Sequence, residues 1–142
     1  MIAKDITYPE LQKAIKISLD YDMDIVSLYD PNISVETIED VQKDIFRKLS
    51  SVEGMKLKGV FEKGDLIGYY TFKGGVLISF ALACQYRTRS FLRKFFSLIK
   101  EEFKGCFMCY LWTKNQRAIR FFLKNGLSIV RHDHLITQLI LE

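Results

Sequence analysis

The stretch VLISFALACQYRTRSFLRKFF, residues 76–96, joins a nearly continuous apolar run to a group of arginines and then to an apolar stripe. The run 76–83 is typical of a central strand buried on both faces of a sheet. Apolar residues from Phe91 to Phe103 then recur on one side of a helix. A second apolar strand, CFMCYLWT at 106–113, follows this helix. Together these segments predict a strand–helix–strand crossover with parallel strands.

The residues before this crossover predict two helices and a hairpin. Thr7 stands three residues before a glutamate, with a proline between them, so a capping box begins a helix that runs to about Leu19. Ser34 begins a second helix, which has a one-sided apolar stripe. The β-rich segments 56–62 and 66–73 are joined by Lys-Gly-Asp, which is a hairpin signature.

The residues after the crossover predict one more helix and the end of the sheet. Asn115 caps this helix, and Asn125 with Gly126 stops it. The final residues, 127–142, predict one or two strands. The order of elements is helix, helix, three strands, helix, strand, helix, strand. It predicts an α+β fold, with a mixed, mostly antiparallel sheet flanked by helices and a parallel crossover in the C-terminal half.

The composition is that of one globular domain. The chain has 142 residues, of which 49% are hydrophobic and 27% charged, so it can bury a proper core. The net charge of +4 is too small to indicate a nucleic-acid partner. No apolar stretch approaches the roughly 20 residues of a membrane span, and Met1 to Asp5 do not form a signal peptide. We therefore expect a cytoplasmic protein with neither nucleic acid nor membrane as a partner.

The cysteines and histidines do not predict a metal or redox site. Cys84, Cys106 and Cys109 lack the rhythm of a disulfide framework. Cys106 and Cys109 lie three apart in a predicted strand, so their side chains point to opposite faces and we interpret them as structural core residues. His132 and His134 share one strand face, but nothing nearby completes a set of metal ligands.

The arginine group lies where the crossover helix is predicted to begin, near Ser90. A helix N-terminus carries a partial positive charge and unpaired N–H groups, and it normally attracts acidic residues. Here cations surround it instead, namely Arg87, Arg89, Arg93 and Lys94. A bound anion would reverse this electrostatic misfit, so the stretch predicts a cradle for one phosphorylated ligand. A solvated basic face stays open as the alternative, while a nucleic-acid stripe and a membrane-lying helix fit the pattern less well.

Two motifs resemble those of the GNAT superfamily of N-acyltransferases. The segment from Arg87 resembles the family's acyl-CoA signature, Q/R-x-x-G-x-G/A, which lies between a strand and a helix. Both glycines of that signature are replaced, by Ser90 and Leu92. The sequence NQRAIRFFLKNGL, residues 115–127, resembles the later motif Asn-x-x-Ala-x-x-x-Tyr followed by Gly-Phe, with Phe122 in place of the tyrosine.

The resemblance implies a GNAT-like fold in a single domain, with a helical acceptor-side region at 1–55 and the sheet and CoA-binding core at 56–142. The strand before the signature would run beside the pantetheine arm of acetyl-CoA. The signature would hold the pyrophosphate, and the last helix would flank the pantetheine and the sulfur. In that order, the implied binding residues are Phe80, Ala81 and Leu82; Arg87, Thr88, Arg89, Ser90, Phe91, Leu92 and Arg93; and Asn115, Ala118 and Phe122.

The resemblance further implies an N-acetyltransferase that moves an acetyl group directly from acetyl-CoA to an amine, without a metal. The tyrosine that often protonates the leaving thiolate in the family is replaced here by Phe122, which has no proton to donate. Tyr110 is the candidate catalytic residue, as an acid or as a water-orienting group. A half-buried sheet tyrosine and a transfer through a water relay remain the alternatives.

The acceptor would lie against the N-terminal helices, where LDYDMDIVSLYDPN at 19–32 gathers aspartates and tyrosines. Such a segment could receive a cationic amine or could be a solvated acidic loop, and the sequence leaves both open. The replaced glycines and Phe122 also leave a second function open. It is that of a non-catalytic GNAT-fold module that binds a ligand or a protein.

Overall fold

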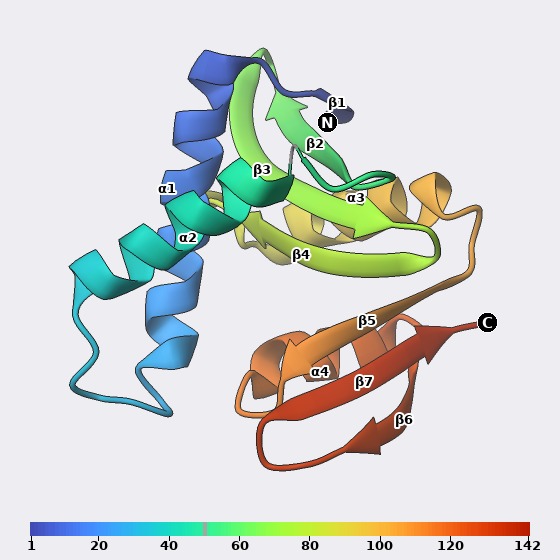
Figure 1. The fold of residues 1–142 in the computed structure, drawn as a ribbon. Coiled ribbons are helices and arrows are strands. Elements are labelled where there is room, and N and C mark those ends of the chain that lie inside the picture. The colour runs from blue at the N-terminus through green and yellow to red at the C-terminus, as the bar shows by residue number, and fades with distance from the viewer. Residues whose placement is uncertain (50) are drawn as a thin grey trace.

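The chain folds into a mixed sheet with helices on both of its faces (Figure 1). The computed structural model describes residues 1–49 and 51–142. Within those residues the sheet has seven strands in the spatial order β1-β2-β3-β4-β5-β7-β6. The strands are β1 (Ile2–Asp5), β2 (Lys56–Glu62), β3 (Asp65–Lys73), β4 (Val76–Leu82), β5 (Phe107–Trp112), β6 (Ser128–His132) and β7 (Ile136–Leu141). The helices are α1 (Tyr8–Val26), α2 (Val35–Leu49), α3 (Arg89–Glu102) and α4 (Gln116–Lys124).

The predicted α+β class is confirmed. The strands β4 and β5 run parallel and α3 connects them, while the other recorded strand pairs are antiparallel. The predicted hairpin between β2 and β3 turns at Lys63 and Gly64, whose φ angles of 52° and 87° are both positive. Such a turn matches the right-handed twist of the strands on either side.

The predicted start of the first helix is confirmed, and its predicted end is wrong. The Thr7 N–H donates to Glu10 Oε1 at 2.9 Å, which closes the N-terminal side of the capping box. The helix α1 does not stop near Leu19 but continues through the acidic segment to Val26. The side chain of Tyr21 packs against an apolar core cluster, so tertiary burial favours the helix beyond the region of strong periodicity.

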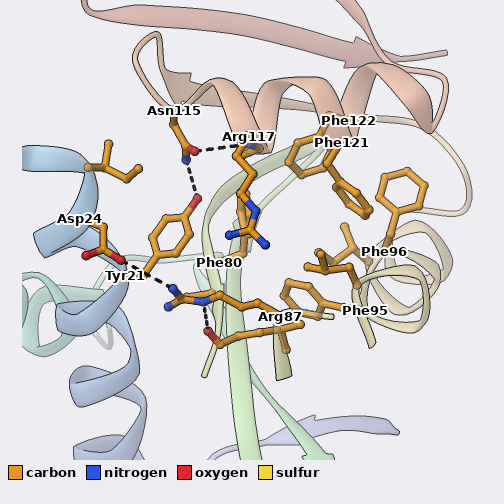
Figure 2. A pocket seen from close by; sticks show the side chains of 16 residues that line it. Tyr21, Asp24, Phe80, Arg87, Phe95, Phe96, Asn115, Arg117, Phe121 and Phe122 are labelled. Atoms are coloured by element: carbon orange, nitrogen blue, oxygen red, sulfur yellow. Dashed lines mark hydrogen bonds and ion pairs between the residues drawn. The ribbon is translucent and has the colours of Figure 1, made fainter. Parts of the chain in front are cut away.

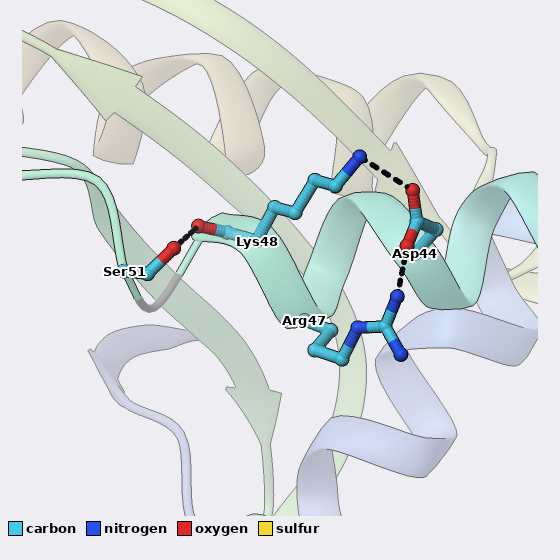
Figure 3. Close-up of polar contacts among 4 residues, drawn as sticks. All are labelled: Asp44, Arg47, Lys48 and Ser51. Atoms are coloured by element: carbon cyan, nitrogen blue, oxygen red, sulfur yellow. Dashed lines mark hydrogen bonds and ion pairs between the residues drawn. The ribbon is translucent and has the colours of Figure 1, made fainter.

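The helix α2 begins at the predicted cap, Ser34, whose Oγ accepts an N–H from the first turn at 3.1 Å. At its other end Asp44 accepts hydrogen bonds from Arg47 and Lys48, the latter at 2.8 Å (Figure 3). Ser51 Oγ donates to the carbonyl of Lys48 at 2.8 Å. These contacts are exposed and contribute little, so the buried apolar side of α2 is what holds the helix on the sheet.

The strand β1 was not predicted from the sequence. It has only four residues, and it pairs at the edge of the sheet with β2, where Ile2 lies opposite Phe61. Ile2 is 59% exposed, so the segment lacks the buried apolar alternation that marks a strand. Its pairing partner lies far away in the chain, so no local pattern predicts it.

The prediction that the strand at 76–83 is buried on both faces is wrong, and the next strand, β5, is also partly exposed. In β4 the side chain of Ile78 is 42% exposed, and in β5 Tyr110 and Trp112 are 43% and 39% exposed. All three side chains line an open groove between α1, α2 and the sheet, and the two strands also separate. Among the described residues their pairing covers only Val76 and Leu77 of β4, after which the strands diverge. Side chains beyond that point face an opening.

Two core clusters lie on opposite faces of the sheet. The face covered by α3 and α4 includes Tyr70, and the face covered by α1 and α2 includes its neighbour Tyr69, as strand alternation requires. Figure 1 shows α1 and α2 in front of the sheet and α3 and α4 behind it. In the described part of the chain, no helix combines the length and the apolar composition needed to cross a bilayer.

Candidate functional site

The site is built around the place where β4 and β5 separate. From Ser79 to Leu82, β4 pairs with β3 along one edge, while its edge toward β5 has no strand partner within the described residues. The amide groups on such an edge can pair with another extended chain of amides. The divergence therefore provides both an opening through the sheet and a backbone surface beside it.

A cavity of about 200 Å³ opens on one side of the divergence, between α3, α4 and β4 (Figure 2). Most of its wall is aromatic or aliphatic, and its polar groups come from α1, from the turn before α3 and from α4. The lining residues are Tyr21, Asp24, Ile25, Phe80, Ala81, Leu82, Arg87, Leu92, Phe95, Phe96, Ile99, Asn115, Arg117, Ala118, Phe121 and Phe122.

A groove of about 510 Å³ opens on the other side, between α1, α2 and the sheet. Three residues, Tyr21, Phe80 and Asn115, line both the cavity and the groove. They therefore form the partition between the two spaces. The groove is lined further by Ser18, Asp22, Val26, Ile33, Thr37, Ile38, Val41, Gln42, Ile45, Phe46, Tyr69, Thr71, Ile78, Ser79, Tyr110, Leu111, Trp112 and Ile136.

The partition is held by a hydrogen bond between α1 and α4. Asn115 caps α4, because its Oδ1 accepts the N–H of Ala118 at 3.3 Å. Its Nδ2 donates to the phenolic oxygen of Tyr21 at 2.5 Å (Figure 2). Burial raises the pKa of Tyr21 above its usual value, so the phenol keeps its proton at neutral pH.

Arg87 turns into the cavity. Its Nε donates to the carbonyl of Leu82 at 2.8 Å, and its Nη1 lies 3.9 Å from a carboxylate oxygen of Asp24. The guanidinium carbon lies 5.1 Å from the centre of the Tyr21 ring. Its Nη2 is buried and has no hydrogen-bond partner among the described residues. An unpaired buried donor is costly, so this nitrogen marks a place for an acceptor group of a ligand.

The start of α3 is open, although both glycines of the signature are replaced. Thr88 Oγ1 accepts the N–H of Phe91 at 3.5 Å, and among the described residues no acceptor is recorded for the N–H groups of Arg89 and Ser90. Ser90 is exposed, whereas Leu92 is half-buried, packs against the core and lines the cavity. The bulk of Leu92 thus points inward and away from the helix start, where an anion would lie.

The cationic side chains near this helix do not all gather at its start. Arg89, Arg93 and Lys94 are exposed around the first turn, as predicted, but the guanidinium of Arg87 contacts Tyr21 and Asp24 instead. The local sequence could not reveal this, because both contacts come from α1.

Phe122 and Tyr110 lie in different places relative to the divergence. Phe122 is buried against Phe80, with ring centres 5.3 Å apart, and lines the cavity together with Ala118. Tyr110, the candidate acid, shares a strand face with Trp112 and lines the groove but not the cavity. Among these tyrosines it is Tyr21 that lines both spaces, and the sequence places it only within an acidic and aromatic segment.

The groove contains one desolvated carboxylate between apolar walls. Asp22 accepts a hydrogen bond from the side-chain amide of Gln42, and Ser18 Oγ donates to the amide oxygen of Gln42 at 2.8 Å. Burial raises the pKa of Asp22 to about 6. No cationic side chain pairs with Asp22 in the described residues. A cationic group of a ligand would find an uncompensated charge there.

The cysteines are placed differently from the prediction. Cys109 is buried in the core, but Cys106 and Cys84 are exposed. Cys106 precedes β5 and does not join the sheet, so its predicted core role is wrong. Across residues 1–49 and 51–142, no group of three or more histidine, cysteine, aspartate or glutamate side chains is arranged to hold a metal ion.

Solved structures resemble this chain over almost its whole length, although no family model and no curated protein matches its sequence. The PaiA N-acetyltransferase from Thermoplasma acidophilum, in complex with coenzyme A, is 17% identical over 99% of this chain and 98% of its own, with a TM-score of 0.70. An acetyltransferase from Thermus thermophilus is 16% identical over 99% and 96%, with a TM-score of 0.76. A putative acetyltransferase of the GNAT family from Desulfovibrio desulfuricans is 12% identical over 99% and 96%, with a TM-score of 0.71.

Proposed function

Because this chain has the GNAT fold, we propose that it is an acyl-CoA-dependent N-acyltransferase that transfers acetyl from acetyl-CoA directly to an amine. The observation that carries the proposal is the divergence of β4 and β5, which joins a cavity on one face of the sheet to a groove on the other. Two substrates that enter from opposite faces can meet at Tyr21, Phe80 and Asn115, which line both spaces.

The cavity and its surroundings suit the three parts of acetyl-CoA. The unpaired edge of β4 at 80–82 offers amide groups to the pantetheine arm. The start of α3 and its rim offer free N–H groups and cations, which suit the pyrophosphate. The residues there are Thr88, Arg89, Ser90, Phe91, Leu92 and Arg93. Arg87 presents its unpaired Nη2 to an oxygen of the same molecule. Ala118 and Phe122 flank the end of the cavity, where the sulfur would lie.

The groove suits an amine that carries an apolar body. Asp22 offers a carboxylate without a cationic partner among the described residues, which favours an ammonium group. The walls are apolar and partly exposed: Val41 is 52%, Ile45 43% and Trp112 39% exposed. One carboxylate with such walls favours a monoamine with an aliphatic or aromatic group over a polyamine.

Thermal unfolding with added ligands tests the proposal. Acetyl-CoA at 100 times its dissociation constant should raise the free energy of unfolding by about 2.7 kcal/mol. Heparin, as an unrelated polyanion, serves as the control. A saturable rise with acetyl-CoA that heparin does not reproduce, together with amine-dependent release of the CoA thiol, supports the transferase. A response to heparin alone would contradict it.

A second candidate function rests on Phe122. Its buried ring cannot donate a proton where the family's acid usually stands, which favours a GNAT-fold module that binds a ligand or protein without catalysis. This module predicts no thiol release with any amine of the class described above, whether or not the protein binds CoA. The two functions therefore differ in turnover.

A further inference from the structure

The proposed transfer leaves a thiolate that needs a proton, and Phe122 cannot supply it. The identity of the side chain that supplies this proton is an inference that rests on the proposed function. Tyr21, on α1, lines the same cavity as Phe122. Its ring centre lies 6.3 Å from that of Phe80, and Phe80 in turn lies 5.3 Å from Phe122. Tyr21 and Phe122 thus both neighbour the ring of Phe80, and of these two residues only Tyr21 carries a hydroxyl group.

The hydrogen bond with Asn115 determines which way the Tyr21 proton points. Asn115 Oδ1 accepts the N–H of Ala118, so its Nδ2 must face Tyr21. A flipped amide would set two donors against each other at Ala118. The phenolic oxygen of Tyr21 is therefore an acceptor in this bond, and its own hydrogen goes elsewhere. No described side chain or carbonyl is recorded as its acceptor, so the O–H is free to donate to a ligand.

The charges around Tyr21 suit a proton donor that later recovers its proton. Burial is the largest effect on its pKa and raises it, and the Asp22 charge raises it further. The Asn115 hydrogen bond and the cations Arg87 and Arg117 act in the opposite direction and would stabilise the tyrosinate after transfer. Asp24 lies close by, but its carboxylate faces Arg87.

We propose that Tyr21 is a catalytic residue, the general acid that protonates the sulfur when CoA leaves. The amine nitrogen forms a bond to the carbonyl carbon of acetyl-CoA, and the carbon–sulfur bond breaks with its electron pair on sulfur. The sulfur takes the hydrogen of the Tyr21 hydroxyl. The ammonium nitrogen loses two protons, one before it attacks and one as the amide forms, and both pass to solvent in the groove. The tyrosinate regains a proton from solvent. The products are the N-acetylated amine and the CoA thiol.

The test measures the pKa of the CoA thiol bound to the full chain, from the ultraviolet absorbance of the thiolate during a pH titration. A donor that points at sulfur favours the thiolate, so the bound thiol of the wild-type protein should have a lower pKa than free CoA. In Tyr21→Phe the pKa of the bound thiol should rise by about 1 to 2, which corresponds to the loss of one hydrogen bond to a charged atom. The turnover number should fall by about 100-fold or more, with little change in the KM for acetyl-CoA.

Two further variants separate catalysis from structure. Tyr29→Phe removes another hydroxyl just beyond the end of α1, one that accepts the Lys114 N–H at 2.9 Å but lines neither space, so the pKa of the bound thiol should stay unchanged. Tyr110→Phe removes the sequence-predicted candidate. A rise in the thiol pKa with Tyr110→Phe and not with Tyr21→Phe would assign the acid to Tyr110 and overturn the inference.

The remaining outcomes are also decisive. A bound thiol in the wild-type protein with a pKa equal to or above that of free CoA would overturn the role of Tyr21 even if Tyr21→Phe failed to fold. CoA binding with the same thiol pKa in wild type and Tyr21→Phe would overturn it while leaving the proposed function intact. A wild-type protein that binds no CoA would overturn the proposed function, and the inference would fall with it.

Discussion

Asn115 donates its side-chain amide to the phenolic oxygen of Tyr21 at 2.5 Å, although 94 residues separate the two in the chain. The same amide group caps α4 through its oxygen. One buried side chain thus caps the start of α4 and joins it to α1. Asn115 therefore contributes both to the stability of the fold and to the proposed chemistry, and substitutions of Asn115 can separate these two contributions.

Asn115→Ala should lower the free energy of unfolding by about 1–2 kcal/mol, because it removes a helix cap. Asn115→Asp keeps an oxygen for the Ala118 N–H, so most of that stability should remain. However, the aspartate can also accept the hydroxyl hydrogen of Tyr21, so acetyl transfer should fall. Urea denaturation and thiol release measure the two effects. Equal losses of stability in both variants would contradict the capping role.

Arg87→Ala should weaken CoA binding by about 10-fold to 100-fold, because the unpaired Nη2 would lose a charge-assisted hydrogen bond to the ligand. Lys100→Ala is the matched control, since it removes an exposed cation from the last turn of the helix that follows Arg87, α3. Isothermal titration with CoA gives both affinities. A similar loss in the two variants would indicate general charge attraction and not a contact made by Arg87.

Asp22→Asn should stabilise the protein at high pH only. The pKa of Asp22 is raised from 3.8 to about 6 by burial, so ionisation costs the folded state more than the unfolded chain. The cost is absent below the unfolded pKa near 4 and is complete above about 6. The free energy of unfolding of Asp22→Asn should therefore exceed that of the wild type by about 1–3 kcal/mol at pH 8, and the two should be equal at about pH 3.5.

Urea denaturation across this pH range measures the effect of Asp22. The control is Asp20→Asn, because Asp20 is an exposed neighbour on the same helix. A gain in stability that appears equally in both variants, or that does not change with pH, would contradict a buried carboxylate in the groove.

Gly68→Ala should destabilise the protein by about 1–3 kcal/mol, because an added Cβ would lie 2.6 Å from the carbonyl oxygen of Ala81 and 2.6 Å from a methyl carbon of Leu82. Both of these residues belong to β4 and line the cavity, so β4 would have to move and CoA binding should weaken. Gly75→Ala meets nothing within 4 Å and should change the stability by less than about 0.5 kcal/mol. Equal free energies of unfolding for Gly68→Ala and Gly75→Ala by urea denaturation would contradict this prediction, because β4 would then move aside at no cost.

The sequence by itself determined the elements whose causes are local. The Thr7 capping box, the turn at Lys63 and Gly64 and the cap at Asn115 each depend on hydrogen bonds or backbone angles within a few residues. The order of these elements then determined the crossover between β4 and β5, and the motifs at 87–92 and 115–122 indicated the GNAT fold.

The tertiary structure alone decided where the chemistry can take place. Three features depend on segments that lie far apart in the chain. They are the separation of β4 from β5, the contact of Arg87 with Asp24, and the contact of Tyr21 with Asn115. Periodicity records which side of an element is buried, but it does not record which other element covers that side. In the sequence, Tyr21 is therefore only one aromatic residue among acidic ones. The packing of α1 against α4 places it between the cavity and the groove.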